Sequence, residues 1–159
     1  MLDTFQGLPV HALIVHATVV LLPVTAIAVA VAAFHARFRD WIGWVLPAVA
    51  VVCVVLTQIT VMSGDKFFDR FERVHGVSKD LEHHRELGEK LIWFVIPFAV
   101  LAVLAYLLRR RDDASKAVVT VVSALAVVSA VSVLVDVALI GHAGASSAWK
   151  PIVENTNKK

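Results

Sequence analysis

The chain has 159 residues, 58% of them hydrophobic, and a mean hydropathy of +0.77. This composition lies well above that of a soluble domain and makes lipid the expected solvent. The net charge is only +2, and the basic residues are divided among separate connectors, which excludes a nucleic-acid binder. The single cysteine, Cys53, lies within an apolar run and cannot form a disulfide within the chain.

Four apolar runs approach or exceed the ~20 residues that a helix needs to cross ~30 Å of hydrocarbon. They predict one transmembrane domain over residues 1–159, with spans at about 9–34, 42–62, 89–108 and 117–140. No Lys or Arg precedes the first run, which is also longer than the apolar core of a signal peptide, so we expect this helix to be retained. The expected fold is all-α, an integral membrane bundle of four antiparallel helices.

The connectors predict the orientation in the membrane. Residues 35–40 and 109–116 together carry six Lys or Arg, and residues 64–90 carry six over roughly twice the length. Because positive charge is denser in the short connectors, we expect these in the cytoplasm. Both termini and the 64–90 loop are then expected outside the cytoplasm.

The loop between the second and third spans has a pattern of its own. Apolar residues recur there at near-helical spacing between charged ones, at Phe67, Phe71, Val74 and Leu81. The pattern favours a short amphipathic helix on the membrane surface, interrupted at Gly76, with Ser78 as the N-cap of the next helix. A solvated connector that covers the end of the bundle is the other interpretation.

Histidine is concentrated at one side of the predicted bundle. Antiparallel threading places six of the seven histidines there: His11, His16, His75, His83, His84 and His142. The same half holds Gln58 and Asp136. A carboxylate within a span costs at least ~2.5 kcal/mol, so Asp136 needs a partner or a watery pocket, and His16 at a similar depth is the expected partner.

These histidines form a candidate cofactor site. Imidazole is a common ligand of iron, copper and zinc, and helical bundles build cofactor sites from facing helices. We expect His16, His84 and His142 as metal ligands from three spans, with His11 as a further cofactor-binding residue. Asp136 and Gln58 are expected around them, and Gly88 leaves a patch without a side chain. The alternative is histidines that only hydrogen-bond headgroups or water, above all His75 and His83.

Several short motifs carry a family resemblance. They are Gly7-Leu8-Pro9-Val10-His11 with Val15-His16, then Ser63-Gly64, the segment 81–88, and Gly141-His142-Ala143-Gly144-Ala145 followed by Trp149. With these motifs the chain resembles a bacterial four-helix integral membrane family of unknown function, domain of unknown function 2231, in particular its actinobacterial branch. The resemblance implies four helices and an outer face marked by His11, His16, His84 and His142. It implies no established activity.

Two functions follow from this pattern. The first is an integral membrane protein that binds haem b, or alternatively copper or zinc, near its outer face for electron transfer or metal handling. The second is a non-catalytic accessory subunit of a larger membrane complex, such as a redox complex, or a homo-oligomer. Small residues at helical spacing would form its contacts: Ala26, Ala30, Ala33, Ala126 and Ala130. Whether the protein is an enzyme stays open.

Overall fold

The computed structural model describes residues 4–5 and 7–156. This part of the chain forms two short strands and five helices: β1 (Thr4–Phe5), β2 (Leu8–Pro9), α1 (Val10–Phe34), α2 (Ala36–Ile42), α3 (Val45–His75), α4 (Lys79–Arg109) and α5 (Lys116–Thr156). The strands pair antiparallel just before α1 begins. The rest of the described chain is helical apart from short turns.

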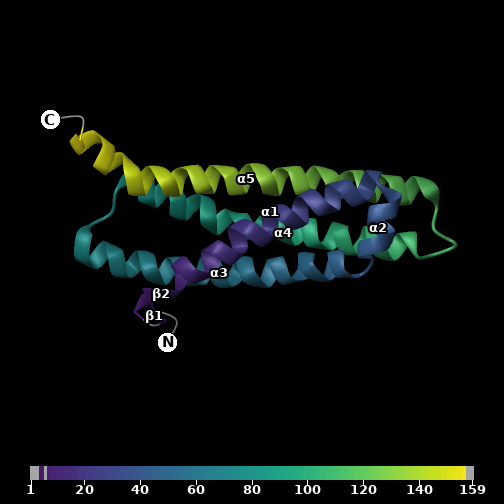
Figure 1. Cartoon of the computed structure of the whole chain (residues 1–159), viewed down its shortest axis with the longest axis horizontal. Coiled ribbons are helices and arrows are strands. Elements are labelled where there is room, and N and C mark those ends of the chain that lie inside the picture. The colour runs from purple at the N-terminus through teal and green to yellow at the C-terminus, as the bar shows by residue number, and fades with distance from the viewer. Residues whose placement is uncertain (1–3, 6, 157–159) are drawn as a thin grey trace.

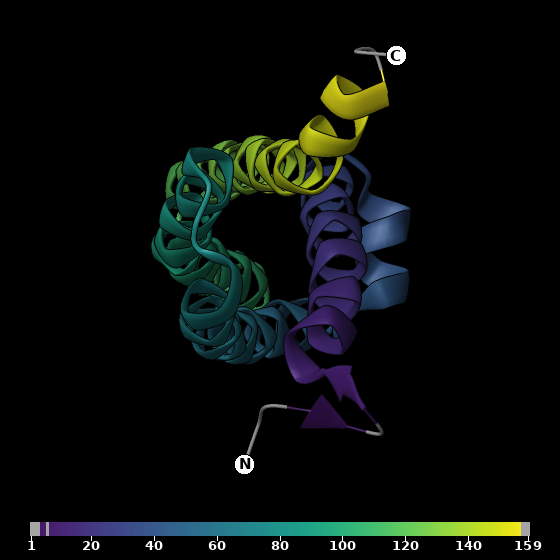
Figure 2. The ribbon, with the colours of Figure 1, turned by 90° about the vertical axis from the view of Figure 1, so that its left-hand side faces the viewer.

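The four long helices form the predicted antiparallel bundle. Each is long and apolar enough to span a membrane. Figure 1 shows that the N-terminus, the C-terminus and the α3–α4 turn lie at one end, and the α4–α5 turn and α2 lie at the other. Viewed end-on, the long helices form a ring in the order α1, α3, α4, α5, and each contacts its neighbours in the ring (Figure 2). The prediction of four membrane spans is confirmed.

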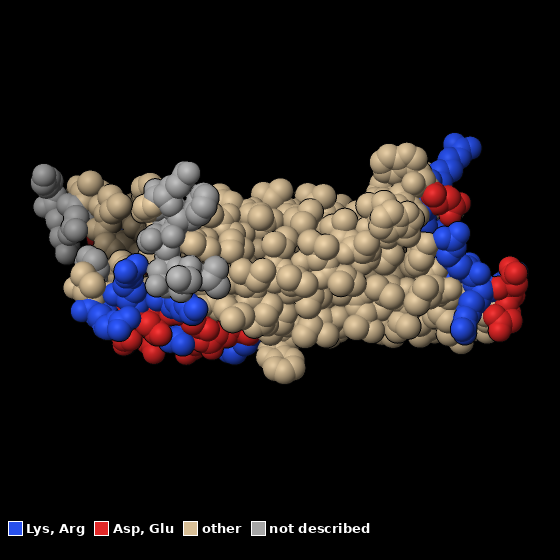
Figure 3. All heavy atoms as spheres, turned by 90° about the horizontal axis from the view of Figure 1, so that it is seen from below, with Lys and Arg blue, Asp and Glu red and all other residues tan. Residues whose placement is uncertain are grey.

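The surface of the bundle is divided as a bilayer requires. On the face shown in Figure 3, Lys, Arg, Asp and Glu gather at the two ends and leave the middle free of these charged side chains. Large apolar side chains point outward along this middle zone, among them Val24 at 58% and Val128 at 61% exposure. Such a surface is favourable only in hydrocarbon. The lipid bilayer is therefore the environment of the four helices.

The stretch between the second and third spans differs from the prediction. α3 runs unbroken through Gly64 to His75, and only residues 76–78 connect it to α4, so the amphipathic stretch is the end of α3 and not a separate surface helix. Phe68 explains the difference, because it is buried at the end of the bundle and holds these turns against the other helices. Gly76, at φ +71°, ends α3 as predicted.

The predicted cap of α4 is also present. The Ser78 side chain accepts a hydrogen bond from the Leu81 backbone N–H at 3.2 Å. The last helix, in contrast, is longer than predicted and continues from residue 140 to Thr156. Its 41 residues span about 60 Å, roughly twice the thickness of the hydrocarbon. α5 therefore projects beyond the membrane at the end that holds the termini.

The bundle contains two similar hairpins, α1–α3 and α4–α5. Five of the six buried residues of α1 lie 7, 11, 14, 15 and 18 positions after His11: Thr18, Leu22, Thr25, Ala26 and Val29. At the same intervals after His84, α4 buries Leu91, Val95, Phe98, Ala99 and Ala102. The second helices match as well, since the residues 18, 14 and 11 positions before Gly64 and before Gly144 are buried: Leu46, Ala50 and Cys53, and Ala126, Ala130 and Val133. The two halves of the ring thus repeat one packing pattern.

Three of the five alanines of the small-residue spacing lie inside this core, while Ala30 and Ala33 are half-buried. Ala26, Ala126 and Ala130 are at most 2% exposed, so they allow the helices of one chain to approach closely. They are not available to a neighbouring protein. Internal packing therefore explains the small residues at these three positions.

We predict that enlarging a core alanine destabilises the bundle. Ala130→Leu adds three carbons at a fully buried position and is expected to cost about 1–3 kcal/mol, because overpacking forces neighbouring side chains and backbone to shift. The matched control is Ala138→Leu, on the exposed face of the same helix. Thermal unfolding in detergent measures both. Equal midpoints for the two variants would contradict the proposed core.

Candidate functional site

A cavity of about 320 Å³ lies among the long helices at the end that holds both termini. We call it the histidine cavity, because His11 of α1 and His84 of α4 both line it. Its other walls are mainly apolar, with Phe67, Phe71 and Leu81 among them. Apolar walls with a few polar groups are typical of small-molecule sites.

His11 lies in a notch on α3. Its Nδ1 is 3.2 Å from the Thr60 carbonyl oxygen and 3.3 Å from Ser63 Oγ. The ring is so close to Gly64 that a Cβ added there would lie 3.0 Å from His11 Cε1. Phe67 stacks on the ring, with the centroids 6.2 Å apart and the planes inclined by 14°. The glycine therefore makes room for the imidazole.

His84 lies in an equivalent notch on α5. Its Nδ1 is 3.0 Å from the Ile140 carbonyl oxygen, and a Cβ added to Gly144 would lie 3.0 Å from His84 Cε1. In both notches the accepting carbonyl belongs to the residue four positions before the glycine. We call this arrangement the histidine–glycine notch. It occurs once in each of the two similar hairpins.

In both notches Nδ1 is hydrogen-bonded and Nε2 is left as the nitrogen that could bind a ligand. A carbonyl oxygen only accepts hydrogen bonds, so Nδ1 carries the proton and Nε2 carries the lone pair. Neither Nε2 has a hydrogen-bond partner within the described chain. The cavity is therefore lined by two imidazoles from opposite hairpins, each held through its Nδ1.

The structure brings together a different set of histidines from the one expected. His16 is exposed on α1, where its Nδ1 hydrogen-bonds the Ala12 carbonyl, and His83 and His142 are exposed as well. His16 follows His11 by five residues, about 140° around a helix, so the two cannot face one cavity. Within the described chain, no three His, Cys, Asp or Glu form a metal-binding group. The side chain of His75 lies outside the described part.

Of the other expected site residues, only Gly88 lines the cavity. Asp136 is buried in the bundle, but it makes no hydrogen bond to His16, and its Oδ2 has no partner within the described chain. Gln58 is exposed on α3 and does not line the cavity. Gly88 does line it, and the space beside its Cα is open, as its lack of a side chain predicts. The predicted contact between His16 and Asp136 is wrong.

Thr57 is a site residue that the expected set omits. It is fully buried and lines the cavity, and its Oγ1 has no hydrogen-bond partner within the described chain. A buried hydroxyl without a partner is costly and usually indicates a ligand or an ordered water. The sequence could have indicated this residue, because Thr57 lies seven positions, or about two turns, before Gly64 and so shares the inward face of α3.

One side of the cavity is closed by charged residues. Arg85 of α4 donates to Asp65 of α3 at 3.1 Å and to Glu89 at 2.9 Å, and its guanidinium lies 4.5 Å from the centre of the Phe68 ring. Both hydrogen bonds come from Nε of the guanidinium. The Arg85–Asp65 ion pair therefore joins the two hairpins across the α3–α4 seam.

Comparison with known proteins identifies the family. A family described as "Predicted membrane protein (DUF2231)" matches residues 7–157. The chain belongs to this family. No curated protein and no solved structure matches it. Both notches of this DUF2231 protein lie within the matched residues, while its place in an actinobacterial branch stays a prediction.

We predict that a methyl group at either notch glycine displaces the imidazole. In Gly144→Ala the new Cβ meets His84 at 3.0 Å, so the hydrogen bond to Ile140 should lengthen or break. Nitrogen-15 NMR of the histidine side chains measures the change at Nδ1. The control is Gly88→Ala, whose Cβ meets no atom within 4 Å and which should gain up to about 1 kcal/mol from helix propensity. An unchanged His84 signal in Gly144→Ala would contradict the notch.

Proposed function

We propose that this protein binds a redox-active metal cofactor between His11 and His84, and that haem b is the first candidate. Electron transfer or metal handling near the outer membrane face is the function that such a site would serve. One observation carries the proposal: two imidazoles in equivalent notches line one cavity, and neither Nε2 has a hydrogen-bond partner within the described chain.

The form of the two histidines supports this function. Metal-binding histidines commonly donate their second ring N–H to a carbonyl or carboxylate, which fixes the tautomer and the ring orientation. The Nδ1–H groups of His11 and His84 do this toward Thr60 and Ile140. A histidine that serves only packing needs neither an oriented ring nor a free Nε2.

The number of ligands favours haem over a bare zinc ion. Haem iron takes two axial ligands, whereas zinc sites take three or four protein ligands. The cavity offers two imidazoles and, within the described chain, no group of three metal-binding side chains. Copper is the alternative that two imidazoles also suit. Gly88 and Gly141 both line the cavity, and neither has a side chain that would obstruct a flat group there.

The residues around the cavity would have different roles toward a bound haem. A bound haem would supply one-electron chemistry at its iron. His11 and His84 would hold it, Gly64 and Gly144 would keep both rings in place, and Thr57 would offer its unpaired hydroxyl to a polar group. The apolar walls would exclude water from the site.

We predict that haem binding depends on the cavity histidines alone. Purified protein titrated with haem b should develop a Soret band, and His11→Ala or His84→Ala should weaken binding by at least about tenfold, because one of the two residues that would hold the haem is lost. The controls are His16→Ala and His142→Ala, which each remove an exposed imidazole. His16 lies on α1, the helix that carries His11, and His142 lies on α5, the helix that forms the notch of His84. The spectra of both controls should match the wild type.

The opposite results are equally clear. Protein that shows no Soret band with haem and binds neither iron nor copper stoichiometrically would refute the proposed cofactor. A band lost equally in the control variants would refute the assignment to His11 and His84.

The same proposal places the cavity at the outer face of the membrane. We predict that, in a Cys53→Ala background, a membrane-impermeant maleimide labels Ser78→Cys in intact cells and labels Asp112→Cys only after lysis. Ser78 lies in the α3–α4 turn beside the cavity, and Asp112 lies in the α4–α5 turn at the other end. The reverse pattern of labelling would place the cavity in the cytoplasm.

A further inference from the structure

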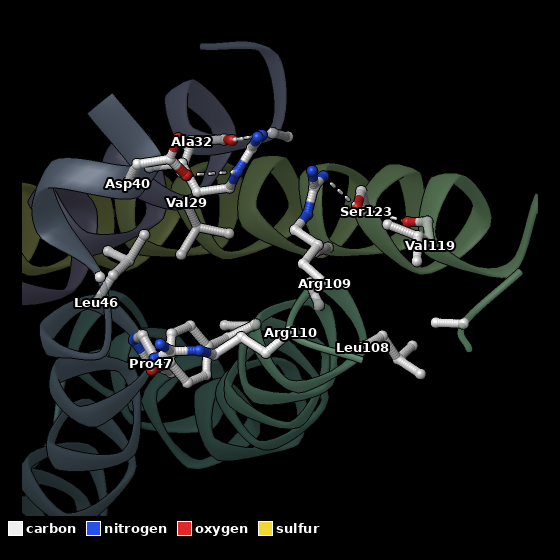
Figure 4. Close-up of a pocket in the computed structure, with 18 of the residues that line it drawn as sticks. Val29, Ala32, Asp40, Leu46, Pro47, Leu108, Arg109, Arg110, Val119 and Ser123 are labelled. Atoms are coloured by element: carbon white, nitrogen blue, oxygen red, sulfur yellow. Dashed lines mark hydrogen bonds and ion pairs between the residues drawn. The ribbon is translucent and has the colours of Figure 1, made fainter. Parts of the chain in front are cut away.

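A second cavity, of about 720 Å³, lies at the opposite end of the bundle (Figure 4). We call it the basic cavity, because five cations and a single carboxylate line it: Arg39, Arg109, Arg110, Arg111 and Lys116, with Asp40. It is formed where α1 ends, α2 and α3 begin, and α4 passes into α5. It lies at the far end of the bundle from the histidine cavity and is independent of the proposed cofactor.

Arg109 is the cation most firmly fixed in this cavity. Its Nη2 donates to Ser123 Oγ of α5 at 2.6 Å, and the serine hydroxyl donates in turn to the Val119 carbonyl. Figure 4 shows the guanidinium held beside Ser123. Within the described chain, Arg109 forms no ion pair with a carboxylate. Neutral groups therefore fix its position, and no carboxylate of the described residues pairs with it directly.

Arg39 faces the same space from α2. Its Nη1 donates to the Ala32 carbonyl at 3.2 Å, and its Nε lies 3.6 Å from Asp40 Oδ1. The charges of Arg39 and Arg109 repel each other, and Asp40 is the one carboxylate that lines the cavity with them. Like charges held close together are stabilised when an anion binds between them.

The floor of the basic cavity is apolar. Val29, Leu46, Ala102 and Ala126 line it below the arginines. Ser123 lies seven residues inside Lys116, the first residue of α5, or about 10 Å along the helix. Cations above an apolar floor at this depth match the boundary between lipid headgroups and hydrocarbon.

We propose that the basic cavity binds a phosphate group, and that an anionic phospholipid of the surrounding leaflet supplies it. Arginine guanidinium groups bind phosphate oxygens through paired N–H donors, and basic pockets between membrane helices bind anionic headgroups. The apolar floor would receive the glycerol and the first part of the acyl chains. A free phosphate compound shares the same headgroup chemistry, so the experiment must separate these two sources.

The experiment compares lipid binding in matched charge variants of the full chain. Native mass spectrometry of protein released from nanodiscs with equal phosphatidylglycerol and phosphatidylcholine measures which lipid stays bound. We expect phosphatidylglycerol to be retained in preference, with Arg109→Gln and Arg111→Gln each reducing the preference about fivefold. Arg111 is exposed and has no side-chain hydrogen bond or ion pair within the described chain, so its variant tests the site without disturbing the fold. Arg70→Gln, on α3 at the other end, is the control with the same change in charge.

A second arm tests a soluble source. Protein in nanodiscs of phosphatidylcholine alone is titrated with glycerol phosphate. Binding in this arm that Arg109→Gln and Arg111→Gln weaken, without any preference for phosphatidylglycerol in the first arm, would support the phosphate site and assign it to a soluble ligand. The proposal is overturned if neither probe binds selectively, or if Arg70→Gln reduces the preference as much as the cavity variants do.

Discussion

The histidine cavity depends on how closely an imidazole can approach the backbone of a neighbouring helix. In an α-helix, each carbonyl is covered in part by the side chain four residues later. His11 and His84 reach a carbonyl on the next helix because that later residue is Gly64 or Gly144. Without this contact the rings would be free to turn, and the two Nε2 atoms would not be held at one cavity.

The contact also links the site to the core. The notches lie at fixed intervals from the buried residues of each hairpin, so the packing that brings α1 against α3 also sets the depth of His11. The same holds for α4, α5 and His84. Alanines deep in the bundle, such as Ala50 and Ala130, let the helices lie close enough for a ring to bridge them. Core packing and site geometry are therefore one property of the fold.

Much of the fold follows from the sequence, because long apolar runs have few alternatives in a membrane. The four spans, the end of α3 at Gly76 and the cap at Ser78 are all predictable. The continuation of α3 beyond Gly64 is not, since charged residues there resemble a loop and only the burial of Phe68 shows otherwise. The histidines were assigned to the correct end, but selecting among them requires the rotation of each helix. That rotation is set by packing, and it turns His16 and His142 outward while His11 and His84 face the cavity.

The repeat of the two hairpins is incomplete at the seams between them. At the α3–α4 seam, Asp65 follows Gly64 and Arg85 follows His84, and the two form an ion pair. The matching positions at the α5–α1 seam hold Ala145 and Ala12. At this level of the bundle, separating α3 from α4 would break an ion pair, whereas the matching positions of α5 and α1 hold no charges to separate.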